Sequence, residues 1–99
     1  EPFDDWYADL DVHAAAKVTV ALTRLAAGNR SETKSVGAGV LERRIDWGPG
    51  YRIYFGLDGK RLVVLLGGGF KNRQQRDIVT AHVRWNDYKS RRNDQETEE

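Results

Sequence analysis

Apolar residues near the start of the chain recur at the spacing of an α-helix. Phe3, Trp6, Tyr7 and Leu10 lie three or four positions apart, so a short helix brings all four to one face. Pro2 suits the first turn of this helix, where its missing N–H loses no hydrogen bond. Three aromatic rings on one face indicate core packing rather than a ligand cage.

A second helix is predicted for residues 12–27. Its apolar stripe consists of Val18, Ala21, Leu22 and Leu25. Gly28 and Asn29 both tolerate the left-handed conformation that ends many helices, so the helix is expected to stop there. Together the two helices are expected to form an αα-hairpin with one apolar face.

The centre of the chain has the pattern of an antiparallel meander. Residues 28–39 are polar and rich in glycine and are predicted to form a loop. Three strands follow, at residues 40–46, 51–57 and 61–66. Trp47-Gly48-Pro49-Gly50 cannot stay in a regular ladder and forms the first turn. Asp58-Gly59 is a strong signal for a two-residue hairpin turn.

The third strand is almost entirely Val and Leu, which predicts a central strand covered on both faces. Gly67-Gly68-Gly69 is expected to end it. A last helix is predicted for residues 74–92. Its apolar side consists of Ile78, Ala81, His82, Trp85 and Tyr88.

These elements predict an α+β fold. The N-terminal αα-hairpin packs on a small twisted antiparallel sheet, a three-stranded meander, and a C-terminal helix follows. Residues 1–92 are predicted to form one domain. Residues 93–99 are an acidic tail that is expected to be disordered.

The net charge of +1 conceals a strongly basic centre. Nine of the 15 acidic residues lie within residues 1–11 and 94–99, so residues 12–93 hold six acids against all 16 lysines and arginines. This segment, at +10, is expected to attract polyanions such as nucleic acid. The alternative is a solubilising surface with charges spread over every face.

The composition argues against several classes of site. The chain has no cysteine, so it has neither a disulfide framework nor a thiolate metal site. His13 and His82 do not form a metal-binding motif, and no cofactor is expected. No apolar run approaches the ~20 residues that span a bilayer. No signal peptide is visible, so a cytoplasmic protein without a membrane partner is expected.

Arginines within the predicted strands indicate that one face of the sheet contacts an anion. Because side chains alternate along a strand, Glu42, Arg44, Arg52 and Tyr54 share the face opposite to the apolar positions. That face is expected to be wet. Arg43 has the parity of the core positions, so it is expected to reach an edge by extending its stem or through a bulge.

Further basic residues follow the third strand, at the entrance to the last helix, where backbone N–H groups favour anions. A cleft between this segment and the wet face would be lined by Arg44, Arg52, Lys71, Arg73 and Arg76. Such a cluster can hold successive phosphates. The alternative for Arg44 and Arg52 is cross-strand pairing with Glu42 and Asp46.

This order of helix, helix, loop, meander and basic helix resembles the RelE/ParE superfamily of toxin–antitoxin toxins, and above all its HigB-like group, the addiction module killer proteins. The resemblance covers residues 2–90. It rests on residues 2–6, 42–55, 65–71 and 76–78, and Gly48-Pro49-Gly50-Tyr51-Arg52-Ile53-Tyr54-Phe55 is its most specific run. Members of the family usually begin with one more strand, ahead of the Pro-Phe helix. Without that strand one sheet edge would be exposed.

The resemblance implies the toxin of a type II toxin–antitoxin module: a metal-independent, ribosome-dependent mRNA endonuclease, neutralised by a protein antitoxin. In such enzymes the 2′-hydroxyl of the target nucleotide attacks its own 3′ phosphodiester, and basic residues stabilise the charge on the phosphoryl oxygens. By position, Arg52 matches the family's strand arginine and is expected to stabilise the transition state. Arg44 would hold the phosphate or orient the 2′-hydroxyl, and Lys71 is the third expected catalytic residue. The expected RNA-binding residues are Arg73, Arg76, Tyr54 and Lys34.

The chain departs from the family at three positions. Ile78 stands where RelE has a tyrosine that stacks on the RNA base, Glu42 where it has a lysine, and Arg43 where an apolar residue is expected. The acid that protonates the leaving group is unassigned, and the acid–base candidates are His82, Tyr54 and Glu42. His82 also fits a residue beside the core, and Glu42 also fits an ion-pair partner of Arg44.

Two other functions remain open at this stage. One is a non-enzymatic ParE-like toxin, which shares the fold and binds DNA gyrase. The other is an inactive family member that only binds its antitoxin. Arginines and lysines gathered on one sheet face favour the endonuclease, whereas basic side chains that scatter or pair with internal acids favour the gyrase-binding toxin.

Overall fold

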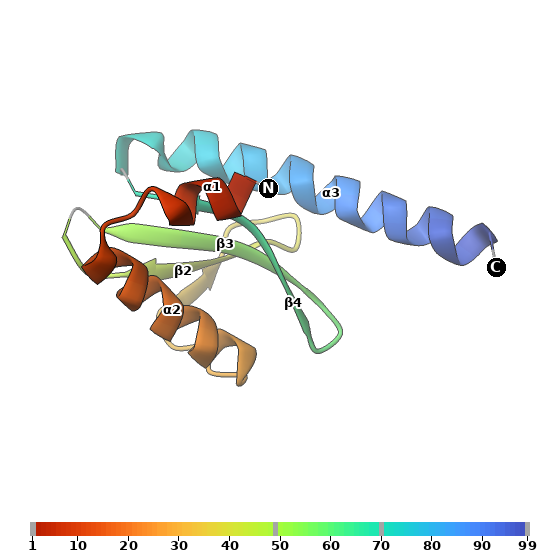
Figure 1. Ribbon diagram of the computed structural model, residues 1–99. Helices are drawn as coiled ribbons and strands as arrows, with labels where there is room; N and C mark the ends of the chain where they lie inside the picture. The colour runs from red at the N-terminus through yellow and green to blue at the C-terminus, as the bar shows by residue number, and fades with distance from the viewer. Residues whose placement is uncertain (1, 49, 70, 99) are drawn as a thin grey trace.

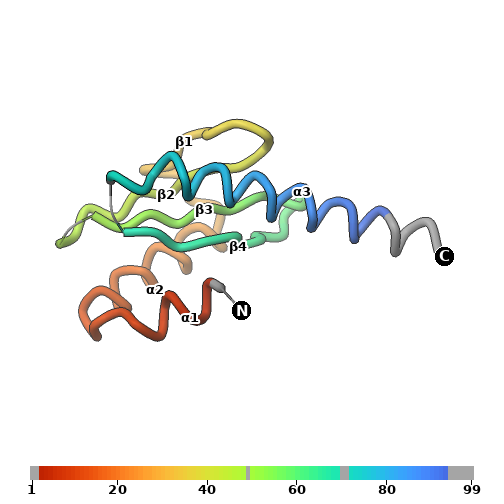
Figure 2. The backbone as a smooth tube through the Cα atoms, turned by 90° about the horizontal axis from the view of Figure 1, so that it is seen from above, coloured from red at the N-terminus to blue at the C-terminus, as the bar shows by residue number. Residues whose placement is uncertain are grey.

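The sheet lies between two helical layers. The computed structural model describes residues 2–48, 50–69 and 71–98, with the side chains of residues 3–48, 50–69 and 72–93. Helices α1 (Pro2–Ala8) and α2 (Val12–Ala26) cover one face of the sheet, and α3 (Gln74–Glu98) lies on the other (Figure 1 and Figure 2). The C-terminal half of α3 extends beyond the sheet (Figure 1). The predicted α+β class is confirmed.

Four antiparallel strands form the sheet, in the order β1-β2-β3-β4. They are β1 (Thr33–Ser35), β2 (Leu41–Ile45), β3 (Tyr51–Asp58) and β4 (Arg61–Gly68). The prediction of three strands was therefore wrong. The additional strand, β1, lies in the segment predicted to be a loop and pairs with residues 41–43. A strand of three residues has too few positions to show an alternating pattern.

The strand predicted to be central, β4, lies instead at an edge of the described sheet. Its Val and Leu side chains are nevertheless in contact with protein on both faces, because α1 packs on one and α3 on the other. A strand covered on both faces has this composition wherever it stands in the sheet. The glycines do not end the strand either, since Gly67 pairs with Ile53 and Gly68 with Arg52.

A β-bulge in β4 adapts this edge strand to α3. The register between β3 and β4 shifts between Tyr54 and Phe55, which leaves Leu65 without a partner in β3. As a result, Leu65 and Leu66 both pack on the α3 side although they are consecutive. The Leu65 carbonyl accepts a hydrogen bond from Nη1 of Arg84 in α3, at 2.9 Å.

Asp11 caps the start of α2, and Gly28 ends the helix as the sequence predicts. The Asp11 side chain accepts hydrogen bonds from the backbone N–H groups of His13 and Ala14, at 2.9 and 3.0 Å. Beyond the helix, Gly28 has a φ of +94° and its N–H donates to the Leu25 carbonyl at 3.0 Å. Together with α1, the helix covers a core cluster on this side that consists of Val18, Ala21, Ile45 and Ile53.

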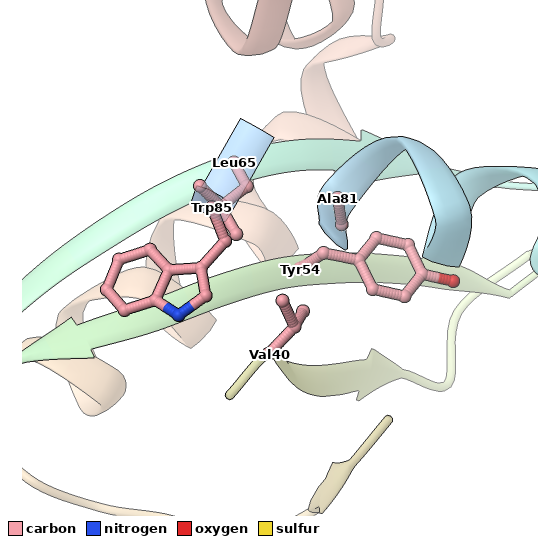
Figure 3. Close-up of a cluster of buried hydrophobic side chains, with 5 residues drawn as sticks. All are labelled: Val40, Tyr54, Leu65, Ala81 and Trp85. Carbon is pink, nitrogen blue, oxygen red and sulfur yellow. The ribbon is translucent and has the colours of Figure 1, made fainter. Parts of the chain in front are cut away.

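The face predicted to be wet is largely covered by α3. A buried cluster forms between α3 and the sheet, consisting of Val40, Tyr54, Leu65, Ala81 and Trp85 (Figure 3). Tyr54 and Glu42 are therefore buried, contrary to the prediction, whereas Arg44 remains exposed. Alternation assigned these side chains to the correct face. It could not show that the apolar side of the last helix would pack on the same face.

Two element ends differ from the predicted ones. The turn between β3 and β4 is Gly59-Lys60, one residue later than predicted, because Asp58 pairs with Arg61. Helix α3 continues beyond residue 92 to Glu98, through most of the segment predicted to be disordered. No glycine or proline interrupts it. That residues 1–92 form an independent domain stays a prediction.

The close approach of Trp85 to the backbone of Gly56 yields a test of the α3 packing. A Cβ at Gly56 would lie 2.5 Å from Cζ3 of the Trp85 ring. Gly56→Ala is therefore expected to lower the free energy of unfolding by about 1–3 kcal/mol, as overpacked cores do, measured by urea denaturation. In a Trp85→Leu background the same substitution should cost less. An equal cost in both backgrounds would contradict this packing.

Candidate functional site

A hollow of about 460 Å³ opens between the sheet and the start of α3. It is lined by Glu32, Thr33, Lys34, Glu42, Arg44, Arg52 and Gln74. Strands β1, β2 and β3 and helix α3 all contribute to these walls. We call this hollow the basic cleft, because Lys34, Arg44 and Arg52 are cationic.

The Glu42 carboxylate lies at the centre of the basic cleft and is only 2% exposed. Its Oε1 is 3.7 Å from Nζ of Lys34 and 3.8 Å from Nε of Arg52. Its Oε2 accepts a hydrogen bond from Nε2 of Gln74 at 2.9 Å. An isolated buried carboxylate would be strongly destabilising, and these contacts offset that cost. Glu42 therefore connects β2 to β1, β3 and α3.

Two buried polar atoms have no hydrogen-bond partner among the described residues: Nε of Arg52 and the hydroxyl of Tyr54. The Arg52 side chain is 12% exposed, and its Nε is too far from Glu42 for a hydrogen bond. Figure 3 shows the Tyr54 hydroxyl pointing away from Trp85. Burial, followed by the negative charge of Glu42, raises the pKa of Tyr54, so the hydroxyl keeps its proton at neutral pH. Buried groups without partners are rare and often mark a place for a ligand or water.

Arg44 stands directly opposite Arg52 in the register of β2 and β3. Its side chain is exposed and forms no ion pair within the described part of the chain. Like charges that face each other across a strand pair repel. A phosphate between the two guanidinium groups would remove this repulsion and accept charge-assisted hydrogen bonds from both. The pair is therefore suited to bind an anion.

The structure brings together four of the residues that the sequence singled out, namely Lys34, Glu42, Arg44 and Arg52. The predicted pairing of Glu42 with Arg44 is wrong, because Glu42 pairs with Arg52 and Lys34 instead. Sequence reasoning missed Gln74 altogether. No pattern distinguishes this residue from Gln75 beside it, and only the way α3 packs turns its amide towards Glu42.

The predicted contribution of Arg73 and Arg76 to the cleft is not found. Arg73 lines a separate hollow of about 320 Å³ together with Asp77, and Arg76 lines neither hollow. Arg73 and Asp77 are four residues apart and therefore lie on the same side of the chain at the start of α3. Gln74 lies on a different side, the one that faces the basic cleft. Lys71 begins the 3₁₀ turn η1 (Lys71–Arg73), and its side chain lies outside the described residues.

Asp77 is a half-buried carboxylate between these basic residues. Burial raises its pKa, and the positive charges of Arg73 and Arg76 oppose this shift. A Cβ at Gly68 would lie 2.5 Å from Oδ2 of Asp77, so the bare backbone of β4 provides the room for this carboxylate. The glycine run therefore accommodates side chains that pack over the end of β4.

His82 and Arg43 lie away from the basic cleft. Nε2 of His82 is 2.8 Å from the carbonyl oxygen of Val36, a contact that holds the β1–β2 connection against α3. Arg43 is buried on the α2 side and donates a hydrogen bond to the Arg44 carbonyl. The β2–β3 register is regular around it, so the alternative of a bulge at this position is wrong.

The cleft offers guanidinium, ammonium, carboxylate and amide groups to a ligand. Among the described residues there is no group of three or more His, Cys, Asp or Glu side chains that could hold a metal ion. In the same part of the chain, no helix is long and apolar enough to cross a membrane.

Comparison with curated proteins identifies a relative in Haemophilus influenzae (strain ATCC 51907 / DSM 11121 / KW20 / Rd), named only as an uncharacterized protein. It is 44% identical over 82 residues, which cover 82% of this chain and 83% of the relative. The chain belongs to the family of this protein. A match of this length includes residues 33–68, and so all four strands, wherever it begins. No family model and no solved structure matches the chain.

The unpartnered Tyr54 hydroxyl allows a test of the buried side of the cleft. Tyr54→Phe removes a hydroxyl that has no partner, so at pH 7 the free energy of unfolding should change by less than about 1 kcal/mol in urea denaturation. A loss well above this value would show that the hydroxyl is hydrogen-bonded.

The same variant should differ from the wild type at alkaline pH. Because the Tyr54 pKa is raised in the folded protein, only the unfolded chain releases this proton near the ordinary value of about 10. Wild-type stability should therefore fall as the pH rises above about 10, and Tyr54→Phe should lose less stability between pH 8 and 11. Equal losses would contradict the raised pKa.

Proposed function

We propose that this protein is the toxin of a type II toxin–antitoxin module and a HigB-like member of the RelE/ParE superfamily. It acts as a metal-independent, ribosome-dependent mRNA endonuclease in the cytoplasm and is neutralised by a cognate antitoxin. The observation that carries this proposal is the pair of facing arginines, Arg44 and Arg52, above the buried Glu42 carboxylate. The sequence resemblance and the order of helix, helix, meander and helix support the same assignment.

In the proposed reaction, the 2′-oxygen of the target nucleotide forms a bond to phosphorus as the bond to the 5′-oxygen breaks. The products are a 2′,3′-cyclic phosphate and a 5′-hydroxyl. Arg52 and Arg44 bind the non-bridging oxygens and stabilise the charge that develops on them. Lys71 is the third proposed cation at the phosphate.

The proton transfers require an acceptor at the 2′-hydroxyl and a donor at the 5′-oxygen. Glu42 is the carboxylate next to Arg52 and is the proposed acceptor. The leaving 5′-oxygen takes its proton from water, because the Tyr54 hydroxyl is buried, does not line the basic cleft and is made a weaker acid by its raised pKa. His82 is engaged with the Val36 carbonyl and is not included in this scheme.

One observation favours a second function, that of a non-enzymatic ParE-like toxin acting on DNA gyrase. The basic side chains are partly neutralised from within, since Arg52 and Lys34 both pair with Glu42. Arg73 lies in a different hollow, with Asp77. A face whose cations are engaged with internal acids has fewer charges left for RNA.

Induced expression distinguishes these functions. The wild type is expected to arrest growth and to produce new mRNA 5′ ends within translated frames. Arg52→Ala should reduce the cleavage rate by about 10²–10³-fold, the usual effect of removing one donor to a developing charge. Arg61→Ala, an exposed strand arginine outside the cleft, is the matched control and should act as the wild type.

Other outcomes would contradict the proposal. Undiminished cleavage in Arg52→Ala would remove Arg52 from the mechanism. Growth arrest with intact mRNA would instead support the gyrase-binding toxin. No growth arrest with the wild type would indicate a protein that only binds its antitoxin. Circular dichroism of each variant confirms that it is folded.

A further inference from the structure

A second basic hollow, of about 510 Å³, lies between β2 and α2, on the side of the sheet opposite to α3. The charged side chains in its lining are Lys17, Arg24, Arg43, Arg44, Glu32 and Asp46. We call it the α2 hollow. Four cations against two carboxylates give it a net positive charge.

The α2 hollow and the basic cleft meet at the edge of β2. Arg44 and Glu32 line both. Strand β1 pairs with residues 41–43 only, so none of the described strands covers the edge of β2 beyond Arg43. At this point the Arg44 N–H donates to the Glu32 carbonyl at 3.1 Å. The two hollows therefore form one basic surface that passes around the end of the β1–β2 pairing.

The cations of the α2 hollow are not neutralised by its carboxylates. None of Lys17, Arg24, Arg43 and Arg44 has a carboxylate oxygen within 4.0 Å in the described part of the chain. Arg43 is the most informative of them, because it is only 9% exposed and still lacks a carboxylate. A buried guanidinium is costly, and an apolar residue would pack at this position without that cost. The positive charge at Arg43 is thus unexplained by packing.

An aromatic side chain stands close to this hollow. Trp47 is 40% exposed, and Nζ of Lys17 lies 5.0 Å from its ring centroid. Exposed rings beside cations are the combination with which proteins bind single-stranded nucleic acid, because bases stack on the rings while the cations contact phosphates. The neighbourhood therefore favours RNA over a simple anion.

We propose that single-stranded RNA bound in the basic cleft continues over the edge of β2 into the α2 hollow. Lys17 and Arg24 contact the phosphates there, Arg43 adds positive potential, and Trp47 stacks on a base. This proposal rests on the proposed function and extends it, since it defines the substrate as a strand several nucleotides longer than the cleaved step.

Fluorescence anisotropy with non-cleavable 2′-O-methyl oligoribonucleotides tests the extension. An oligonucleotide of about four nucleotides should occupy the basic cleft alone, and one of about twelve should also reach the α2 hollow. The variant is Lys17→Glu/Arg24→Glu, which changes two exposed residues on one side of α2. It should reduce the affinity for the longer oligonucleotide about tenfold or more and leave the affinity for the shorter one unchanged.

The salt dependence provides a second readout with a milder variant. Each phosphate contact to a single strand contributes about 0.7 to the slope of log K against log salt, so Lys17→Gln/Arg24→Gln should reduce the slope for the longer oligonucleotide by about 1.4. Lys60→Glu/Arg61→Glu, at the β3–β4 turn, makes the same charge change as Lys17→Glu/Arg24→Glu and is the matched control for that variant. It should leave both affinities near the wild-type values.

The outcomes separate this inference from the proposed function. If Arg52→Ala lowers the affinity for both oligonucleotides while Lys17→Glu/Arg24→Glu lowers neither affinity, the extension is wrong. The proposal that RNA binds in the basic cleft would then still stand. If both oligonucleotides weaken equally in Lys17→Glu/Arg24→Glu, or if the control pair has the same effect, the extension is also wrong. If the wild type binds neither oligonucleotide, the extension is contradicted, and an acidic protein becomes the better partner for this surface. The proposed function is then decided by the mRNA 5′ ends after induced expression, because the proposed cleavage takes place on the ribosome.

Discussion

The arrangement of the candidate site depends on one buried charge, the carboxylate of Glu42. It is almost completely enclosed, and its contacts come from Lys34 on β1, Arg52 on β3 and Gln74 on α3. Removing one partner from a buried ion pair typically costs several kcal/mol, because the other charge is left uncompensated. The Glu42 side chain thus contacts β1, β3 and the start of α3 and fixes their relative positions around the cleft.

This constraint also shapes what the cleft can bind. Glu42 holds the Nε side of Arg52 at 3.8 Å, while Arg44 opposite has no carboxylate of its own in the described residues. The cleft is therefore neither a fully neutralised ion-pair network nor an unrestrained basic patch. Arg52 is held by an internal carboxylate, and Arg44 keeps its positive charge for an anion. The proposed cleavage and the proposed RNA path both begin from this property.

Much of the fold follows from local sequence patterns, and the site follows only in part. Periodicity identified the helices, and strand alternation placed Glu42, Arg44, Arg52 and Tyr54 on one face. The contacts of that face could not be derived, since they depend on how α3 crosses the sheet. Tyr54 is buried and Gln74 faces Glu42 for this reason. Strand β1 was missed because three residues are too few to show an alternating pattern. Strand β4 was predicted to be central because its apolar composition reflects burial on both faces, and α1 and α3 provide that burial at the sheet edge.

The most direct measurement of the central claim is an NMR titration that follows the arginine Nε–Hε signals while a non-cleavable oligoribonucleotide is added. If the facing arginines above Glu42 bind the phosphate, the signals of Arg44 and Arg52 should shift together and saturate, while that of Arg61 should stay in place. Shifts confined to arginines outside the cleft, or no shift of Arg52 at saturation, would contradict the account.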